Sequence, residues 1–505
     1  MPGSFCQLDH VLTSLSRVAT RNAWRAGACL AAILGPAQAL QADPWISAGD
    51  GRLRHDLELL SDAGIVHAPL TAWPVSWAEV ARDIGGANES QLPLHLAAAL
   101  ERVRQTARDE TQTGELRLDA TLSGSEKPME LRRFDDVPRE SGEISVGAQY
   151  LGDRFAMRLQ ATGVADASDG KDMRADGSYV AAVLGNWMLH AGYIDRWWGP
   201  GWEGSLIYGS NSRPIPSITI ERNYSDPVDH PWFRWIGQWR LVATMGQLEE
   251  ERTDAPNAQL FGMRATWKPH PRLEVGFSRT AQWCGDGRPC DLGTFWDLLI
   301  GNDNDQPLSE QPGNQLGGFD ARWSLPWAPV ALYAQAIGED EADFLPTKYL
   351  GLAGIEFWGG FGECSWRAHI EAADTTCSFY SNPPQYGCAY RNVIYRDGYQ
   401  YYDRVIGHSI DGDSRQIAAG LMLVNGDGSS WELALQDASV NRKGANPVQS
   451  VSPFPMDIAS LDLHHRRTLF GGDLRVSIGY EERDADAEGV HQEDFRGYLQ
   501  WSARF

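Results

Sequence analysis

From about residue 115 to the end of the chain, apolar residues alternate with polar or small ones. The stretches 187–193 and 474–480 show this pattern over seven residues each. A period of two places alternate side chains on opposite faces of a β-strand, so each stretch predicts a strand with one apolar face. About eighteen such segments can be counted, which predicts an all-β fold for residues 113–505.

The connections between these segments alternate in length. Short turns are expected near 151–153, 184–186, 269–271, 326–328, 359–362, 425–429 and 471–473. Long polar loops lie near 125–142, 165–177, 196–216, 249–257, 284–316, 341–347, 376–414, 441–458 and 485–494. This alternation is typical of up-and-down transmembrane barrels of the outer membrane, with turns on the periplasmic side and loops outside. The segment 223–233 is the one periplasmic connection that is longer than expected.

The last strand supports the same interpretation. Phe495, Leu499, Trp501 and Ala503 share one face, and the chain finishes on Phe505. Such an end resembles the insertion signal of Gram-negative outer-membrane barrels, so barrel insertion machinery and outer-membrane lipid are expected partners. With 20 Trp and 16 Tyr, aromatic girdles can form at both interfaces. A closed barrel leaves no edge strand to pair, which predicts a monomer.

The region 43–112 has a helical pattern instead. Leu53, Leu57 and Leu60 fall on one helical face, and Ser76 with Glu79 predicts a capping box. Pro93 suits the first turn of a further helix. We expect a periplasmic bundle of about three helices that is either a docking module or a lid on the barrel.

Residues 1–42 are expected to be a signal peptide that is removed. Three arginines precede the small-residue apolar stretch 26–36, and 37–39 or 40–42 offers a small-x-small cleavage site. After Ala42 no apolar run approaches the roughly 18 residues that a membrane helix needs.

The charge balance excludes one class of partner. Lys plus Arg number 44 against 67 Asp plus Glu, so the net charge is 44 − 67 = −23. No basic run offsets this balance, which argues against a nucleic-acid partner. No cofactor is expected.

The cysteines predict two disulfides. Of the five beyond the signal peptide, Cys284 with Cys290 and Cys377 with Cys388 each bracket a short loop, which suits pairing in an oxidising compartment. Cys364 is left as a buried thiol in a strand. The spacings do not fit zinc, and no metal site is expected.

The stretch 195–227 is rich in turn formers, aromatic rings and polar groups. Trp faces stack on sugar rings, and Asn, Ser and Arg supply hydrogen bonds to hydroxyls or carboxylates, with Arg213 as a possible carboxylate clamp. The alternative is a loop that plugs the barrel with aromatic filler. A second region, 388–414, could extend the same surface. The candidate saccharide-binding residues are Asp195, Arg196, Trp197, Trp198, Trp202, Ser210, Asn211, Arg213, Arg222, Arg391, Arg404 and His408.

A catalytic site is not expected. In an extended segment His408 and Ser409 point to opposite faces, so they cannot form a dyad. The nucleophile-elbow pattern fails because Asp411 stands where the final Gly would be. The pairs Asp411 with Asp413 and Asp303 with Asp305 lack the ligand series of a calcium loop and are interpreted as solvated turns.

Several runs of the chain resemble those of a known family. The runs 195–202 and 210–216, the later runs 386–392 and 404–409, and the barrel that ends in Phe505 are similar to the Wzi family of capsule assembly proteins. The resemblance implies an eighteen-stranded outer-membrane barrel with a periplasmic helical bundle, acting as a lectin that attaches capsular polysaccharide or exopolysaccharide to the cell surface. The alternatives are a porin or saccharide diffusion channel, which needs an open lumen, and a hydrolase at the barrel rim. The Pro- and Trp-rich stretch 196–216 favours a closed lumen.

Overall fold

The computed structural model describes residues 45–300, 313–342 and 345–505. The predicted signal peptide and the Asp303 and Asp305 turn lie outside these residues. Within the described part of the chain, no helix is both long and apolar enough to cross a membrane. The described residues from Trp45 onward belong to one compact unit.

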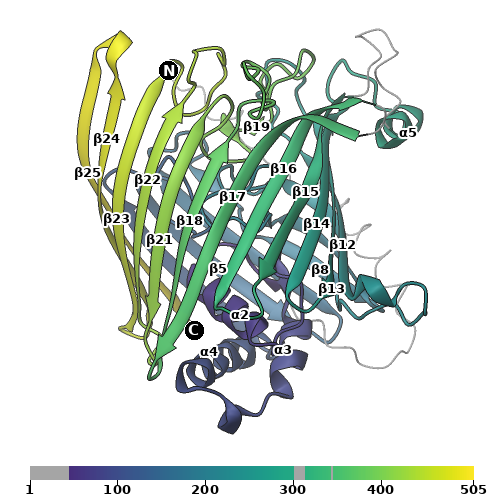
Figure 1. The fold of residues 1–505 in the computed structure, drawn as a ribbon, viewed down its shortest axis with the longest axis vertical. Coiled ribbons are helices and arrows are strands. Elements are labelled where there is room, and N and C mark those ends of the chain that lie inside the picture. The colour runs from purple at the N-terminus through teal and green to yellow at the C-terminus, as the bar shows by residue number, and fades with distance from the viewer. Residues whose placement is uncertain (1–44, 301–312, 343–344) are drawn as a thin grey trace, which may run out of the picture. The chain divides into compact units, whose positions relative to one another are not determined.

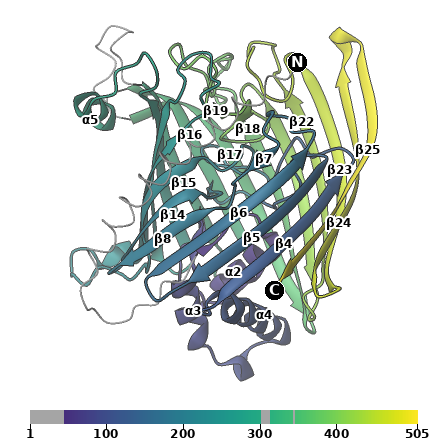
Figure 2. The same cartoon turned by 180° about the vertical axis from the view of Figure 1, so that it is seen from behind.

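This unit is built around a closed antiparallel barrel (Figures 1 and 2). Its segments are β4 (Leu116–Ser125), β5 (Gly142–Leu151), β6 (Phe155–Ala165), β7 (Met173–Arg174), β8 (Tyr179–Leu184), β9 (Trp187–Tyr193), β11 (Pro216–Arg222), β12 (Gln238–Gln247), β13 (Gln259–His270), β14 (Leu273–Trp283), β15 (Gly313–Ser324), β16 (Val330–Ala342), β17 (Leu345–Phe361), β18 (Cys364–Asp374), β21 (Arg415–Val424), β22 (Ser430–Val440), β23 (Met456–Leu469), β24 (Gly472–Ala485) and β25 (Val490–Arg504). Apart from β7, which pairs with β6 alone, each pairs with its neighbours in this order, and β25 closes the barrel on β4. Because β7 and β8 both pair with β6, they form one interrupted strand, so these 19 segments make 18 strands among the described residues. The expected strand number and topology are confirmed.

The two faces of the wall differ as the alternation predicts. Leu435 and Leu461 lie opposite each other on β22 and β23 and are 45% and 44% exposed on the outer face. Their neighbours Gln436 and Asp462 point inward and are buried. A barrel with apolar residues outside and polar ones inside is suited to a lipid environment, because strand closure satisfies every backbone hydrogen bond within the wall.

Short turns and long loops occupy opposite ends of the barrel (Figure 1). All seven predicted turns fall between paired strands, and exposed Trp327, Phe361 and Phe470 mark the turn end. The segment between β11 and β12 is long, as expected, and contains a short 3₁₀ helix, η2 (Arg234–Ile236). A further helix, α5 (Leu292–Ile300), lies in the loop after β14.

Three helices lie at the turn end (Figure 2). They are α2 (Gly51–Asp62), α3 (Trp77–Gly85) and α4 (Leu94–Glu110), with a 3₁₀ turn, η1 (Glu89–Gln91), before α4. The capping box predicted for Ser76 and Glu79 is wrong. The Ser76 hydroxyl donates to Asn223 instead, and Glu79 accepts from Ser225. Both side chains therefore join the helices to the segment after β11.

The amino-terminal segment also reaches the interior of the barrel. Its two-residue strands are β1 (Trp45–Ile46), which pairs with β3 (Val75–Ser76), and β2 (Ala72–Trp73), which pairs with β10 (Trp197–Trp198) in the loop after β9. Arg54 of α2 donates to the carbonyl oxygens of Pro200 and Gly201 at 2.7 and 2.8 Å. The amino-terminal segment and the loop after β9 thus pack together inside the barrel.

The plugged mouth as candidate functional site

The loop between β9 and β11 folds back into the lumen. We call residues 196–216 the Trp-rich loop. Polar side chains of the wall hold its backbone, because Glu371 accepts hydrogen bonds from the amides of Trp202 at 2.8 Å and Gly204 at 3.0 Å. Gln335 accepts from the amide of Leu206 at 2.8 Å. A buried carboxylate and amide therefore supply the acceptors that a loop inside a barrel needs.

The three tryptophans of this loop are buried. Trp197, Trp198 and Trp202 are 1%, 1% and 5% exposed. The guanidinium of Arg54 lies 4.0 Å from the ring centre of Trp202, and the imidazole of His369 is stacked against the ring at 5.7 Å. With such faces covered by protein, no sugar ring can stack on them in this conformation. The burial favours the plug interpretation for these residues.

A second loop locks the first in place. The Tyr-rich loop, residues 376–414, sends the hydroxyls of Tyr390 and Tyr399 to the carbonyl oxygens of Leu206 and Ile207, each at 2.8 Å. Asn211 donates in return to a carbonyl oxygen of the Tyr-rich loop at 3.1 Å. Each loop thus satisfies backbone groups of the other deep in the mouth.

Glycine allows the closest contact between the two loops. A Cβ added to Gly204 would lie 2.1 Å from the imidazole of His408. That distance is far inside van der Waals contact, so His408 packs directly on the Gly204 backbone. Burial lowers the pKa of His408 to about 4, which keeps the imidazole neutral at physiological pH. His408 is 0% and its neighbour Ser409 2% exposed, so a polymer in the solvent reaches neither.

The loop between β4 and β5 completes the plug. Phe134 donates its amide to Trp202 at 3.0 Å, and Ser210 donates its hydroxyl to the Arg133 carbonyl oxygen at 2.7 Å. The Arg133 guanidinium lies 3.8 Å from the Glu203 carboxylate. Burial alone would raise the pKa of Glu203, but Arg133 and hydrogen bonds from His369 and Gln436 lower it to about 2. The charge buried in the plug is therefore paired.

One hairpin of the Tyr-rich loop remains at the surface. Strands β19 (Gln400–Tyr401) and β20 (Arg404–Val405) pair around the two residues Tyr402 and Asp403, whose φ angles are 48° and 56°. A two-residue hairpin of this kind demands left-handed backbone at both central positions, which costs free energy for residues other than Gly and Asn. The conformation places a partly exposed tyrosine ring at the hairpin tip.

Two cations lie near the Tyr402 ring. The guanidinium of Arg213 is 5.2 Å from the ring centre, and the ammonium of Lys171 is 5.7 Å away. Tyr401 packs edge-on against it, with ring centres 4.7 Å apart. We call Tyr402, Arg213 and Lys171 the Tyr402 cluster. It brings the predicted Arg213 together with Tyr402, which lies in the second candidate region 388–414, and with Lys171, which the sequence analysis did not single out.

Arg213 is not a free carboxylate clamp. Its Nε and Nη2 each donate to Asp176 at 2.9 Å, and its Nη1 donates to Asp169 at 2.5 Å. Lys171 is paired with Glu251 at 2.5 Å. Both cations of the cluster are therefore matched by carboxylates, so the surface offers many hydrogen-bonding groups without a strong positive field.

The remaining candidates lie apart from one another. Asp195 is 3.5 Å from Arg139, which also donates to the carbonyl oxygens of the Trp-rich loop. Arg196 is buried and donates to β11, and Arg391 donates to Ala445 at 2.7 Å. Arg404 is 30% exposed and 3.9 Å from Glu130, near the mouth.

Arg222 does not belong to the mouth. It ends β11 at the turn end, where its guanidinium stacks 3.8 Å from the Trp239 ring and donates to the Trp239 carbonyl oxygen at 2.8 Å. Seven residues of strand carry it about 20 Å from the loop end. Arg222 is close to the Trp-rich loop in sequence but not in space, because β11 runs from the loop end of the barrel to the turn end between them.

The predicted disulfides are confirmed. The Cα atoms are 4.5 Å apart in Cys284–Cys290 and 6.1 Å apart in Cys377–Cys388. Cys364 is a free thiol at the start of β18, but it is only partly buried and lies 3.3 Å from Asn425. One group in the described part of the chain, Glu482 with His491 and Glu493, has its ligand atoms close enough for a metal ion. These side chains are partly or fully exposed on the last hairpin.

Three comparisons with known proteins agree with this architecture. The chain is 32% identical over 426 residues to an uncharacterized 55.8 kDa protein in the cps region of Klebsiella pneumoniae, covering 82% of each chain. It is similar in structure to Wzi of Escherichia coli, an outer-membrane protein involved in group 1 capsule assembly and a carbohydrate-binding β-barrel. That match has 28% identity and a TM-score of 0.81, and it covers 92% of this chain and 100% of the other. The family model of the capsule assembly protein Wzi matches residues 112–496, and the chain therefore belongs to the Wzi family.

Proposed function

We propose that this outer-membrane barrel binds capsular or other surface polysaccharide on the closed loop end and holds the polymer at the cell surface. The observation that carries the proposal is the Tyr402 cluster, a partly exposed aromatic ring set among paired charges on top of a filled lumen. The carbohydrate binding of the Escherichia coli relative supports the same function.

The chemistry of the cluster suits a polymer of hydroxylated rings. The Tyr402 face provides apolar contact for a pyranose, while the surrounding guanidinium, ammonium and carboxylate groups donate to and accept from hydroxyls. Because Arg213 and Lys171 are already paired, the cluster should bind neutral and acidic polymers with similar strength. Arg391 and Arg404 are candidates for further contacts with the polymer, although Arg391 donates to the Ala445 carbonyl oxygen and Arg404 lies 3.9 Å from Glu130.

The porin alternative needs a continuous aqueous path, which the packing opposes. Side chains of the Trp-rich and Tyr-rich loops form one buried cluster with the inner wall. The hydrolase alternative needs an accessible nucleophile and base, and the burial of His408 and Ser409 opposes it at that position.

We further propose that the loop end faces outside the cell and that the helices of residues 43–112 lie in the periplasm. The placement of short turns and helices at the same end supports this orientation (Figure 1). A signal peptide over residues 1–42 would be consistent with export.

Binding of the purified barrel to an array of bacterial polysaccharides tests the function. We expect Tyr402→Ala to weaken binding by roughly 30-fold, as for an aromatic hot spot worth about 2 kcal/mol. Tyr402→Phe, which keeps the ring face, should bind nearly as well as the wild type. Tyr380→Ala, in the same loop and 64% exposed, is the matched control. Unchanged binding of a folded Tyr402→Ala variant would show that the polymer is held elsewhere.

A further inference from the structure

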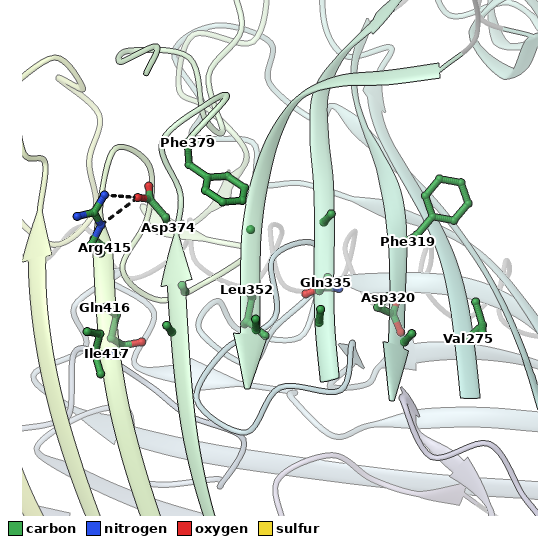
Figure 3. Close-up of a pocket in the computed structure, with 17 residues that line it drawn as sticks. Val275, Phe319, Asp320, Gln335, Leu352, Asp374, Phe379, Arg415, Gln416 and Ile417 are labelled. Atoms are coloured by element: carbon green, nitrogen blue, oxygen red, sulfur yellow. Dashed lines mark hydrogen bonds and ion pairs between the residues drawn. The ribbon is translucent and has the colours of Figure 1, made fainter. Parts of the chain in front are cut away.

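A groove runs along the outer wall of the barrel below the Tyr-rich loop (Figure 3). Its volume is about 660 Å³. The floor is formed by six small residues on four adjacent strands: Ala321, Ala334, Ala336, Gly351, Ala353 and Ala372. The register places them on one face, since Ala334 pairs with Ala353 and Ala353 with Ala372.

Larger outward side chains form the sides of the groove. Phe319 on β15 is 46% exposed, and Ile417 on β21 is 59% exposed. Between them the floor residues carry no side chain beyond Cβ, so the wall is recessed. The outer wall faces lipid, and the recess therefore matches a flexible hydrocarbon chain better than a flat protein surface.

The loop-side end of the groove is polar, and two arginines meet there. Arg415 lies beside Asp374 in Figure 3 and donates to its carboxylate at 2.8 Å. The Arg442 guanidinium lies 3.8 Å from the same carboxylate. Two cations share one anion at this point, and the exposed Asp437 and Asp457 lie on the next two strands, β22 and β23. The Arg415 side chain is 54% exposed and can accept a second anionic partner.

We propose that this groove binds an acyl chain of a phosphorylated glycolipid of the outer leaflet, with a phosphate on Arg415 and Arg442. An apolar recess that ends in a pair of arginines complements a lipid in both parts, because guanidinium groups bind phosphate through two parallel hydrogen bonds. The proposal rests on the orientation proposed above, in which the loop end faces outside.

The groove is also joined to the Tyr-rich loop. Phe379 lies within the loop closed by Cys377–Cys388, and its ring occupies the space beside Gly351, where an added Cβ would be 2.5 Å away. A lipid in the groove contacts Phe379 and so braces the base of the loop that carries the Tyr402 cluster. Lipid binding would thereby stabilise the surface that meets the polysaccharide.

Native mass spectrometry of the detergent-purified protein with lipid A as the probe tests the proposal. The double substitution Ala334→Leu and Ala353→Leu fills the floor and should weaken lipid A binding by roughly tenfold or more, because the acyl chain loses its recess. Ala182→Leu places the same side chain on β8, far around the wall, and should leave binding unchanged. Heat-modifiable migration on a gel confirms that each barrel is folded.

The arginines are tested separately. Arg415→Gln with Arg442→Gln should also weaken lipid A binding by roughly tenfold and should abolish its salt dependence. Phosphatidylethanolamine should bind wild-type protein more weakly than lipid A. Full lipid A binding by the folded, groove-filled variant would overturn the acyl site, and an unchanged arginine variant would overturn phosphate recognition. Neither measurement depends on polysaccharide binding, so the two proposals fail independently.

Discussion

Substituting Trp202 by Ala should open a barrel that is otherwise closed. Trp202 is 5% exposed and lies where the Trp-rich loop meets the wall, the loop after β4 and helix α2. Removing a buried Trp side chain costs about 3 to 5 kcal/mol through lost burial and the cavity left behind. The indole Nε1 also donates to Glu356 at 3.2 Å, and that bond is lost as well.

The substitution destabilises only the closed state of the plug. In the open state the loop has left its place in the barrel, so residue 202 makes none of these buried contacts in either the wild type or the variant. A loss of about 4 kcal/mol changes the ratio of open to closed plug by about a thousandfold. The strands of the wall keep their hydrogen bonds, so the barrel should still migrate as a folded, heat-modifiable species.

Planar-bilayer conductance measures the opening directly. We expect negligible conductance from the wild type and frequent channel events from Trp202→Ala. Trp327→Ala is the control, since that side chain is 73% exposed at a turn, and exposed substitutions usually change stability by less than about 0.5 kcal/mol. Limited proteolysis should in parallel cut the Trp-rich loop faster in Trp202→Ala. A folded Trp202→Ala barrel that stays closed and resists proteolysis would refute the reasoning, as would steady conductance of the wild type.

Two further predictions concern the Tyr-rich loop. The pKa of His408 is about 4 in the closed plug, below the value of about 6.5 in an unfolded chain. The released loop therefore takes up a proton more readily than the closed one. As pH falls from about 6.5 to about 4, the free energy that favours the closed plug should decrease by up to about 3 kcal/mol. Tryptophan fluorescence between pH 7.5 and 4.5 should show this loosening, with a flatter profile for His408→Gln; identical profiles would contradict it. The Cys377–Cys388 disulfide closes a short loop and should stabilise the folded conformation of that loop by about 3 kcal/mol. The double substitution Cys377→Ser with Cys388→Ser should therefore speed proteolytic cleavage of the Tyr-rich loop. The Cys284→Ser, Cys290→Ser pair is the control, and equal cleavage of the Tyr-rich loop in both variants would count against a local effect.

The barrel could be predicted from the sequence because its signals are local. Alternation within each strand and the length of each connection both depend on neighbouring residues alone, as 187–193 shows. The disulfides were predictable for the same reason, since Cys284 and Cys290 are six residues apart.

The candidate site was harder to predict because burial of loops is not local. The three tryptophans around Gly199 are of a residue type that is typical of sugar-binding sites. Only the fold shows that Arg54, more than a hundred residues earlier in the chain, covers the Trp202 ring. Tyr402 lies in the region 388–414 that the sequence analysis offered as a second candidate surface, while Lys171 had no signal in the sequence. Their meeting depends on three loops that converge at the barrel mouth.

The packing of α2 against the barrel bears on the role of the amino-terminal helices. An independent docking module would turn a polar face to solvent, yet Arg54, Asp56 and Glu58 of α2 are all buried. At the end of the helix, Asp62 accepts two hydrogen bonds at 2.9 Å from Arg322 of the wall.

Such buried pairs are costly to separate, because each partner would be left as an uncompensated charge. Since Arg54 also holds the backbone of the Trp-rich loop, α2 acts as the base on which the plug rests. Movement of the helices away from the barrel would therefore remove support from the mouth, so a partner that binds α4 can coexist with a closed plug only if α2 stays in place.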